Sequence, residues 1–178
     1  SFFGRGCVAH VAMAHPTCSR LSDLIHQTAQ EIGIDTVLGG TYLAMEGPQF
    51  STCAESEMYR SLNCDVIGMT NIPEAKLARE AEMCYTSIAM VTDYDCWHPE
   101  HDHVTTQQII KTLSENAANA QTLLKNIIPR INSDSSAPAC SCRFALDNAI
   151  ITPPASRDPE IVLKLSAVAG RVFKNGKP

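Results

Sequence analysis

The feature that most constrains the fold of this chain is an apolar run that ends abruptly in two acidic residues. Residues 87–91 read Ser-Ile-Ala-Met-Val, and residues 92–97 continue Thr-Asp-Tyr-Asp-Cys-Trp. A short, apolar, partly β-branched run predicts a buried strand, and open α/β sheets bind ligands at the carboxyl ends of their strands. We therefore interpret Asp93 and Asp95 as active-site carboxylates. The alternative is a strand that runs into an ordinary acidic turn.

Composition favours one globular domain and excludes two classes of partner. Of the 178 residues, 44% are hydrophobic and 19% are charged, which is enough apolar material for one sizeable core. The net charge of -5 and the pI near 5.6 argue against binding to nucleic acid or to a membrane surface. No apolar run has the roughly 18 residues of a membrane helix, and the first residues lack a signal-peptide pattern. We expect a cytoplasmic protein.

A second strand-turn-helix pattern lies upstream of the acidic pair. Residues 36–45 are β-rich and run into a Gly-Pro turn, after which Thr52 and Glu55 form a capping box that opens a helix. Phe50 and Ser51 fall just before this helix, near its positive end, where a small ligand binds favourably. A plain connector that ends in a core phenylalanine is the alternative.

Strands and helices alternate along most of the chain. We expect strands over residues 6–13 and 65–71 and helices over residues 18–32 and 72–81, with a long helix from residue 104 to about 128 that Pro129 ends. Such alternation is typical of parallel sheets with crossover helices. The predicted fold class is therefore α/β, with a mixed, largely parallel central sheet flanked by helices.

The last quarter of the chain differs in composition. Residues 132–142 read as a linker, and residues 143–178 as a C-terminal helical extension with a final helix over residues 159–173. We expect residues 1–178 to form a single α/β domain that includes this extension.

Cysteines and histidines raise the question of disulfides and metals. With no signal segment, the eight cysteines are expected to be mostly buried free thiols. Cys140 and Cys142 are too close in sequence for an ordinary metal site, so they are expected to form a strained disulfide together or two bridges to other cysteines. The histidines and acids of residues 98–103 lack zinc-site spacing, and a proline interrupts them. We expect no metal.

Three segments, read together, resemble a known family. They are residues 45–56, 68–70 and 92–97, which would lie at adjacent strand ends. The set closely resembles the 5'-methylthioadenosine phosphorylases of the trimeric purine nucleoside phosphorylase family, over at least residues 2–130. Residues 140–152 look like the C-terminal extension of prokaryotic and archaeal members. The resemblance implies a nucleoside phosphorylase-like fold, of which this chain is the C-terminal part, and a homotrimer or a dimer of trimers.

The resemblance also implies a pentosyltransferase reaction. Inorganic phosphate, the co-substrate, attacks the anomeric carbon of methylthioadenosine and releases adenine and 5-methylthioribose 1-phosphate, a step of methionine and purine salvage that needs no cofactor. The alternatives are phosphorolysis of methylthioinosine or of purine nucleosides in general, and a non-catalytic fragment that binds nucleosides.

Chemistry gives the two acids different roles in this reaction. Adenine is a poor leaving group until N7 is protonated or strongly hydrogen-bonded, which a neutral carboxylic acid can accomplish. Asp93 is the candidate for this general acid, and Asp95 would accept a hydrogen bond from the exocyclic amine. In 6-oxopurine enzymes of the family an Asn replaces the first acid and a Glu replaces Ser51, so this chain is expected to select a 6-aminopurine.

The remaining site assignments rest on the resemblance. Phe50 would stack on the base and Met69 would cover the ribose, while Thr70 would donate to phosphate. The other expected substrate contacts are Thr92, Thr106, Ile109 and His10, the last reaching the methylthio pocket of a neighbouring subunit. The family's Gly-rich phosphate loop, Arg-His pair and first base-edge strand have no equivalent in these residues. We therefore expect part of a longer enzyme that binds phosphate poorly by itself.

Overall fold

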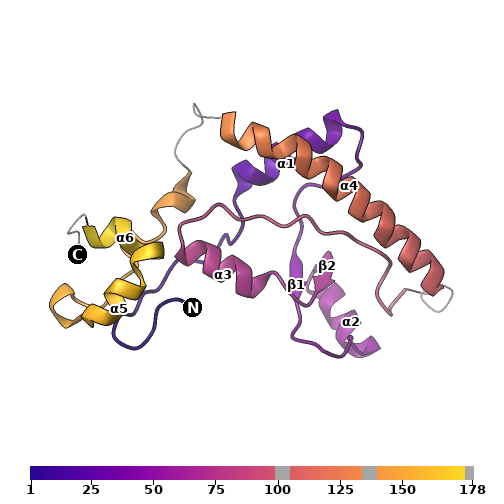
Figure 1. Cartoon of the computed structure of the whole chain (residues 1–178). Helices are drawn as coiled ribbons and strands as arrows, with labels where there is room; N and C mark the ends of the chain where they lie inside the picture. Colours follow the sequence, from indigo (N-terminus) through magenta and orange to yellow (C-terminus); the bar gives the residue numbers. More distant parts are fainter. Residues whose placement is uncertain (99–104, 134–139, 175–178) are drawn as a thin grey trace. The chain divides into compact units, whose positions relative to one another are not determined.

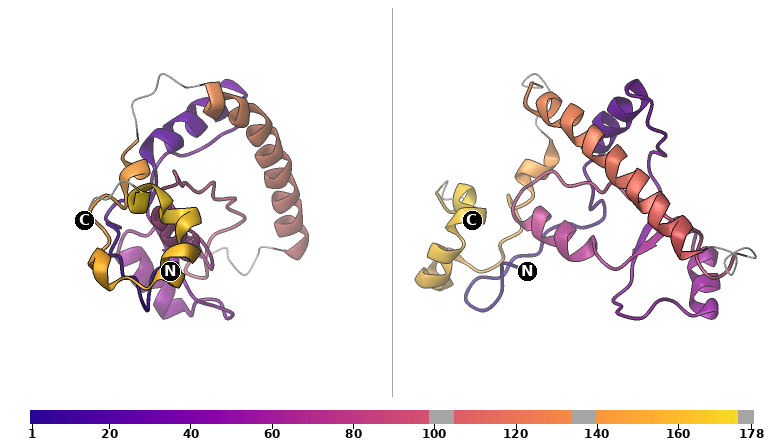
Figure 2. Two further views of the ribbon diagram at one scale, coloured as in Figure 1. Left: turned by 60° about the vertical axis from the view of Figure 1, so that its left-hand side comes forward. Right: turned by 45° about the vertical axis from the view of Figure 1, so that its right-hand side comes forward.

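The computed structural model describes residues 1–98, 105–133 and 140–174 (Figure 1). These residues belong to two compact units. The first unit comprises Ser1–Leu21, Ile72–Thr86 and Ser136–Pro178, and the second comprises Ser22–Asn71 and Ser87–Ser135. Figure 2 shows the helices and strands from two further sides. Among the described residues, no helix combines the length and apolar character that crossing a membrane requires.

The second unit contains a parallel pair of strands joined by a helix. Strand β1 (Tyr42–Ala44) pairs with β2 (Val66–Gly68), and α2 (Cys53–Ser61) lies between them in sequence. This β1-α2-β2 unit confirms the predicted α/β class with parallel strands. Both strands are shorter than predicted, because their backbones pair over only three positions.

The start of α2 is the predicted capping box. The Glu55 N–H donates to the Thr52 hydroxyl at 3.3 Å, and the Thr52 N–H donates to the Glu55 carboxylate at 2.7 Å. The Thr52 N–H and hydroxyl lower the pKa of the Glu55 carboxyl. Both bonds satisfy backbone groups that a helix N-terminus leaves without partners, so α2 begins where the sequence predicts.

The predicted end of the long helix is wrong. Helix α4 (Thr106–Ser133) continues through Pro129, although a proline cannot donate a backbone hydrogen bond within a helix. Arg130, the next residue, donates to the Thr28 hydroxyl at 3.3 Å and pairs with Glu31 at 2.6 Å. Both partners belong to α1 (Ser19–Glu31), whose bounds agree with the prediction. These contacts hold the last turn of α4 in place despite the proline.

Helix α4 buries only part of its apolar surface. Leu123 and Ile127 are buried, whereas Leu113 and Leu124 are about half exposed. Apolar side chains occupy more than one face of the helix, and the described residues cover only one of these faces.

Two predicted strands are absent from the structure. Residues 87–91 have no regular secondary structure, and residues 6–13 make only isolated bridges, such as Ala9 to Ile150. A strand needs a neighbouring segment to satisfy its backbone groups. Within the described residues, only β1 and β2 supply such a neighbour over consecutive positions.

The first unit is built around its own apolar core. Its elements are α3 (Ile72–Glu80), the short η2 (Ser141–Phe144) and η3 (Pro154–Ser156), and α5 (Pro159–Lys164) and α6 (Ser166–Lys174). The predicted single final helix is therefore two helices, which divide at Leu165. The core residues are Phe3, Cys7, Leu146, Ala149, Leu165, Ala169 and Val172.

Candidate active site

A pocket of about 880 Å³ in the second unit gathers most of the predicted site residues. Its walls come from the ends of β1 and β2, from α2, from residues 89–97 and from the start of α4. The predicted site residues that line it are Phe50, Ser51, Met69, Thr92, Asp93, Asp95 and Ile109. The three segments of the sequence pattern therefore meet at one pocket, and the chemical role of each residue stays a prediction.

The Asp95 carboxylate is held by a hydrogen bond at each oxygen. The Ser56 hydroxyl donates to Oδ2 at 2.7 Å, and the Cys96 N–H donates to Oδ1 at 2.8 Å. Ser56 is only 1% exposed, so its hydroxyl is fixed in the first turns of α2. Each carboxylate oxygen has a second lone pair, which leaves Asp95 able to accept a further hydrogen bond from a ligand.

The Asp93 carboxylate is held at one oxygen only. The neighbouring Thr92 hydroxyl donates to Asp93 Oδ1 at 2.6 Å. Within the part of the chain that the structure describes, Oδ2 has no hydrogen-bond partner, and the side chain is half-buried in the pocket wall. The two acids thus differ in how they are held: the protein orients Asp95 at both oxygens, and Asp93 has one oxygen available to a ligand.

An aromatic and cationic wall completes the pocket. The Arg60 guanidinium lies 3.7 Å from the centroid of the Trp97 ring, and the Tyr94 ring stacks on His98 with centroids 4.2 Å apart. Sequence reasoning gave no role to Ser56 or Arg60. Their spacing could have indicated that both face the pocket, because residues four apart on a helix lie on the same face.

A close approach of the turn after β1 helps to place Met69. Gly47 has a φ of 72°, and a Cβ at this position would lie 2.7 Å from the Met69 sulfur. Only glycine adopts this backbone conformation without strain and also leaves room for the Met69 side chain. The predicted Gly-Pro turn therefore also shapes the pocket wall.

Three predicted site residues lie elsewhere. Thr70 and Thr106 are exposed and do not line this pocket. His10 belongs to the other unit, where it lines a separate pocket of about 770 Å³. Because a role for His10 was expected only across a subunit boundary, a single chain leaves that prediction open. Residues 99–103 of the histidine-rich segment lie outside the described residues.

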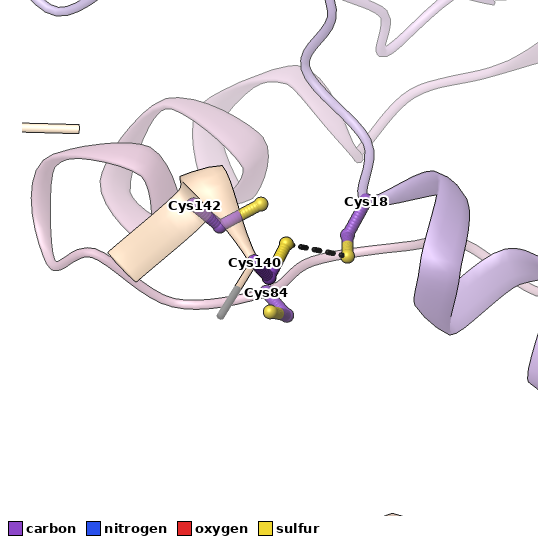
Figure 3. Close-up of side chains that lie close together, drawn as sticks. All are labelled: Cys18, Cys84, Cys140 and Cys142. Carbon is purple, nitrogen blue, oxygen red and sulfur yellow. Dashed lines mark hydrogen bonds between the residues drawn. The ribbon is translucent and has the colours of Figure 1, made fainter. Parts of the chain in front are cut away.

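All eight cysteines are free in the structure, so Cys140 and Cys142 form neither of the disulfides considered above. Their thiols instead lie close to those of Cys18 and Cys84 in the first unit (Figure 3). Of the remaining cysteines, Cys7 is buried as expected, whereas Cys53 is exposed at the start of α2 and Cys64 and Cys96 are only partly buried.

Comparison with known proteins agrees with this arrangement. Residues 1–129 match the family model described as "Phosphorylase superfamily". The S-methyl-5'-thioadenosine phosphorylases of Cereibacter sphaeroides and Bradyrhizobium diazoefficiens are 58% and 55% identical over 174 residues, which are 98% of this chain and 60% of each relative. The chain thus spans about 60% of the length of these relatives.

Solved structures show the same fold. A methylthioadenosine phosphorylase from an Antarctic soil metagenomic library is 43% identical with a TM-score of 0.86, over 94% of this chain and 58% of that one. The methylthioadenosine phosphorylase of Schistosoma mansoni in complex with adenine is 30% identical with a TM-score of 0.64, over 71% of this chain and 50% of that one. The family match covers well over half of the residues, and the chain belongs to the phosphorylase superfamily.

Proposed function

We propose that the protein containing these residues catalyses phosphorolysis of S-methyl-5'-thioadenosine to adenine and 5-methylthioribose 1-phosphate. The observation that carries the proposal is the pair of differently held carboxylates, Asp93 and Asp95, in the pocket that Phe50, Ser51 and Met69 also line. The names of the relatives support the same reaction.

Asp93 supplies the proton or strong hydrogen bond that the departing base needs. Its Oδ2 is available to a ligand, while Thr92 holds Oδ1 at 2.6 Å. A hydrogen bond to N7 withdraws electrons from the purine as the sugar becomes cationic, so it is strongest in the transition state and accelerates bond cleavage.

Asp95 selects the base. When the group is ionised, its two anchored oxygens accept hydrogen bonds and donate none, which suits a donor such as the 6-amino group of adenine. A 6-oxopurine would place a carbonyl oxygen against the carboxylate and leave a buried polar group without a partner. The Schistosoma mansoni enzyme has been solved with adenine, and a mutant form of it with methylthioadenosine.

The other parts of the reaction and the assembly extend the same proposal. Inorganic phosphate is the co-substrate, Thr70 contributes a hydroxyl to it, and no cofactor takes part. The apolar faces of α4 support assembly with further protein, since Ile110 and Ile128 are 57% and 56% exposed. A homotrimer or a dimer of trimers in the cytoplasm is the expected form.

The test uses the protein produced from its natural gene, so that any sequence beyond these residues is present. Asp93→Asn should lower kcat for methylthioadenosine by about 100-fold or more, because an amide donates a hydrogen bond but cannot transfer a proton. The same change should raise the ratio of methylthioinosine to methylthioadenosine turnover. Adenine release at saturating phosphate, followed by chromatography, gives both values.

A matched control is Asp23→Asn, which alters an exposed aspartate on α1 away from the pocket. It should keep the activity of the parent enzyme. Binding of adenine, followed through the fluorescence of Trp97 in the pocket wall, shows whether each variant retains its fold. Unchanged kcat in the Asp93 variant would refute its role, and no adenine release from the unaltered enzyme would refute the proposed function.

A further inference from the structure

Four cysteine thiols from separate parts of the chain meet in the first unit (Figure 3). Cys18 precedes α1, Cys84 follows α3, and Cys140 and Cys142 belong to the η2 element. Their sulfur atoms all lie within 4.8 Å of one another, and those of Cys18 and Cys140 are 3.4 Å apart. Cys18 and Cys142 are buried, so the cluster is shielded from solvent on part of its surface.

We propose that these four cysteines bind one Zn²⁺ ion as a closed tetrathiolate site that stabilises the first unit. Zn²⁺ takes four ligands in a tetrahedron at about 2.3 Å, which sets the sulfur-sulfur separation at about 3.8 Å. The Cys18 and Cys140 sulfur atoms are 3.4 Å apart, and no pair among the four sulfur atoms is separated by more than 4.8 Å. Movements of about 1 Å or less, within the range of side-chain rotation, would close the site.

The spacing of Cys140 and Cys142 alone argues against such a site, because zinc ligands are usually separated by two to four residues. The structure changes this argument in two ways. Cys140 is the N-cap of η2, whose tight helical turn brings Cys142 to the same cluster. Cys18 and Cys84 then supply the other two ligands from segments that are distant in sequence.

The surroundings of the cluster suit the charge of the bound site. Four thiolates around Zn²⁺ carry a net charge of -2. Arg79 Nη1 lies 3.7 Å from the Cys142 sulfur, and the Arg20 side chain hydrogen-bonds to Cys84. Two guanidinium groups therefore balance the site. Two disulfides would carry no negative charge, so they would not offset the positive charges of Arg79 and Arg20.

Backbone groups also point at the sulfur atoms. The Leu21 N–H hydrogen-bonds to the Cys18 sulfur, and the Cys142 N–H hydrogen-bonds to the Cys140 sulfur. Hydrogen bonds of this kind stabilise metal-bound thiolates and orient them. An N–H donor favours the anionic form of a sulfur atom, which is the form that coordination requires.

Coordination requires each sulfur as a thiolate. Each of the four thiols would therefore release its proton to solvent as its sulfur takes a coordination position from water.

The experiment measures metal directly in the full 178-residue chain and in the protein from its natural gene. Both are purified without chelator from cells grown with added zinc, and metal per chain is measured by mass spectrometry. We expect about one zinc per chain, which a mercurial reagent releases as it modifies the thiols. Co²⁺ added to the reduced, metal-free chain should give the intense visible bands of a tetrahedral tetrathiolate.

Matched variants separate a specific site from adventitious metal. Cys84→Ser and Cys142→Ser should weaken Zn²⁺ binding by at least about 100-fold, since each removes a ligand. Cys7→Ser alters a fully buried thiol in the apolar core and should keep one zinc per chain. The unaltered chain gives the decisive measurement if a variant does not fold. Less than about 0.1 zinc per chain with no cobalt spectrum would overturn the proposal, as would a mass showing that the four cysteines are paired in disulfides.

Discussion

The strongest test of the first unit concerns Arg171, which joins α6 to the segment that follows α3. Its guanidinium donates to both carboxylate oxygens of Glu82, at 2.8 and 2.5 Å, and to Asp147 at 2.5 Å. Glu82 first and Asp147 second raise the pKa of Arg171, so the guanidinium stays charged. Arg171→Met keeps much of the side-chain length and removes all three bonds.

The expected magnitude follows from how buried each partner is. The Glu82 side chain is only 9% exposed, and after the substitution it retains the Leu146 N–H as a donor at 3.0 Å. Removing one partner of a fully buried ion pair costs about 3–5 kcal/mol. Arg171 and Asp147 are 36% and 38% exposed, so solvent screening reduces this cost. We expect a loss of about 2–3 kcal/mol in the free energy of unfolding.

Urea unfolding followed by far-UV circular dichroism measures this loss. Hydrogen exchange of the α6 peptides should increase in parallel, because the helix loses its connection to Glu82. Arg171→Lys keeps the charge but not the two-pronged geometry, and should lose about half as much. Combining Arg171→Met with Glu82→Gln should give a coupling energy of about 1 kcal/mol or more. A loss below about 0.5 kcal/mol, with no coupling, would refute the reasoning.

Two further predictions concern the pocket and the thiol cluster. Gly47→Ala should weaken adenine binding, because the new Cβ would lie 2.7 Å from the Met69 sulfur. Gly33 has a similar φ of 74° and open space around it, so Gly33→Ala should affect only stability. Equal adenine binding by both variants, measured through Trp97 fluorescence, would contradict this prediction. In the metal-free chain, the alkylation rate of Cys140 should rise with pH to half its maximum near pH 7, because the cluster's hydrogen bonds outweigh burial and lower its pKa to about 7. Iodoacetamide labelling with peptide mass spectrometry gives the midpoint, and a value near the ordinary pKa of about 8.5 would contradict the assignment.

Features that depend on neighbouring residues in sequence could be predicted. Thr52 and Glu55 are three residues apart, and their reciprocal bonds begin α2 as expected. Features that depend on distant partners could not. Pro129 carries a correct local signal for a helix end, but Arg130 contacts α1 about a hundred residues away and the helix continues. No local pattern contains that contact.

The thiol cluster could not be predicted either, because it joins segments that are distant in sequence. Considered as a pair, Cys140 and Cys142 indicate disulfides rather than a metal site, because zinc-binding cysteines are rarely separated by a single residue. Cys18 and Cys84 carry no signal of their own, since each lies alone beside a helix. Only the fold of the first unit, which brings residues 18, 84, 140 and 142 together, turns four unrelated cysteines into one group.

Seven of the predicted site residues line one pocket although residues 87–91 form no strand, and the reason is topological. Strands β1 and β2 are parallel, so their carboxyl ends point the same way, and Met45 and Met69 directly follow them. Both line the pocket, and residues 92–97 reach it from a segment that lacks strand hydrogen bonds. The direction of β1 and β2 therefore fixes the edge at which the pocket forms, and Asp93 and Asp95 reach that pocket although residues 87–91 do not pair as a strand.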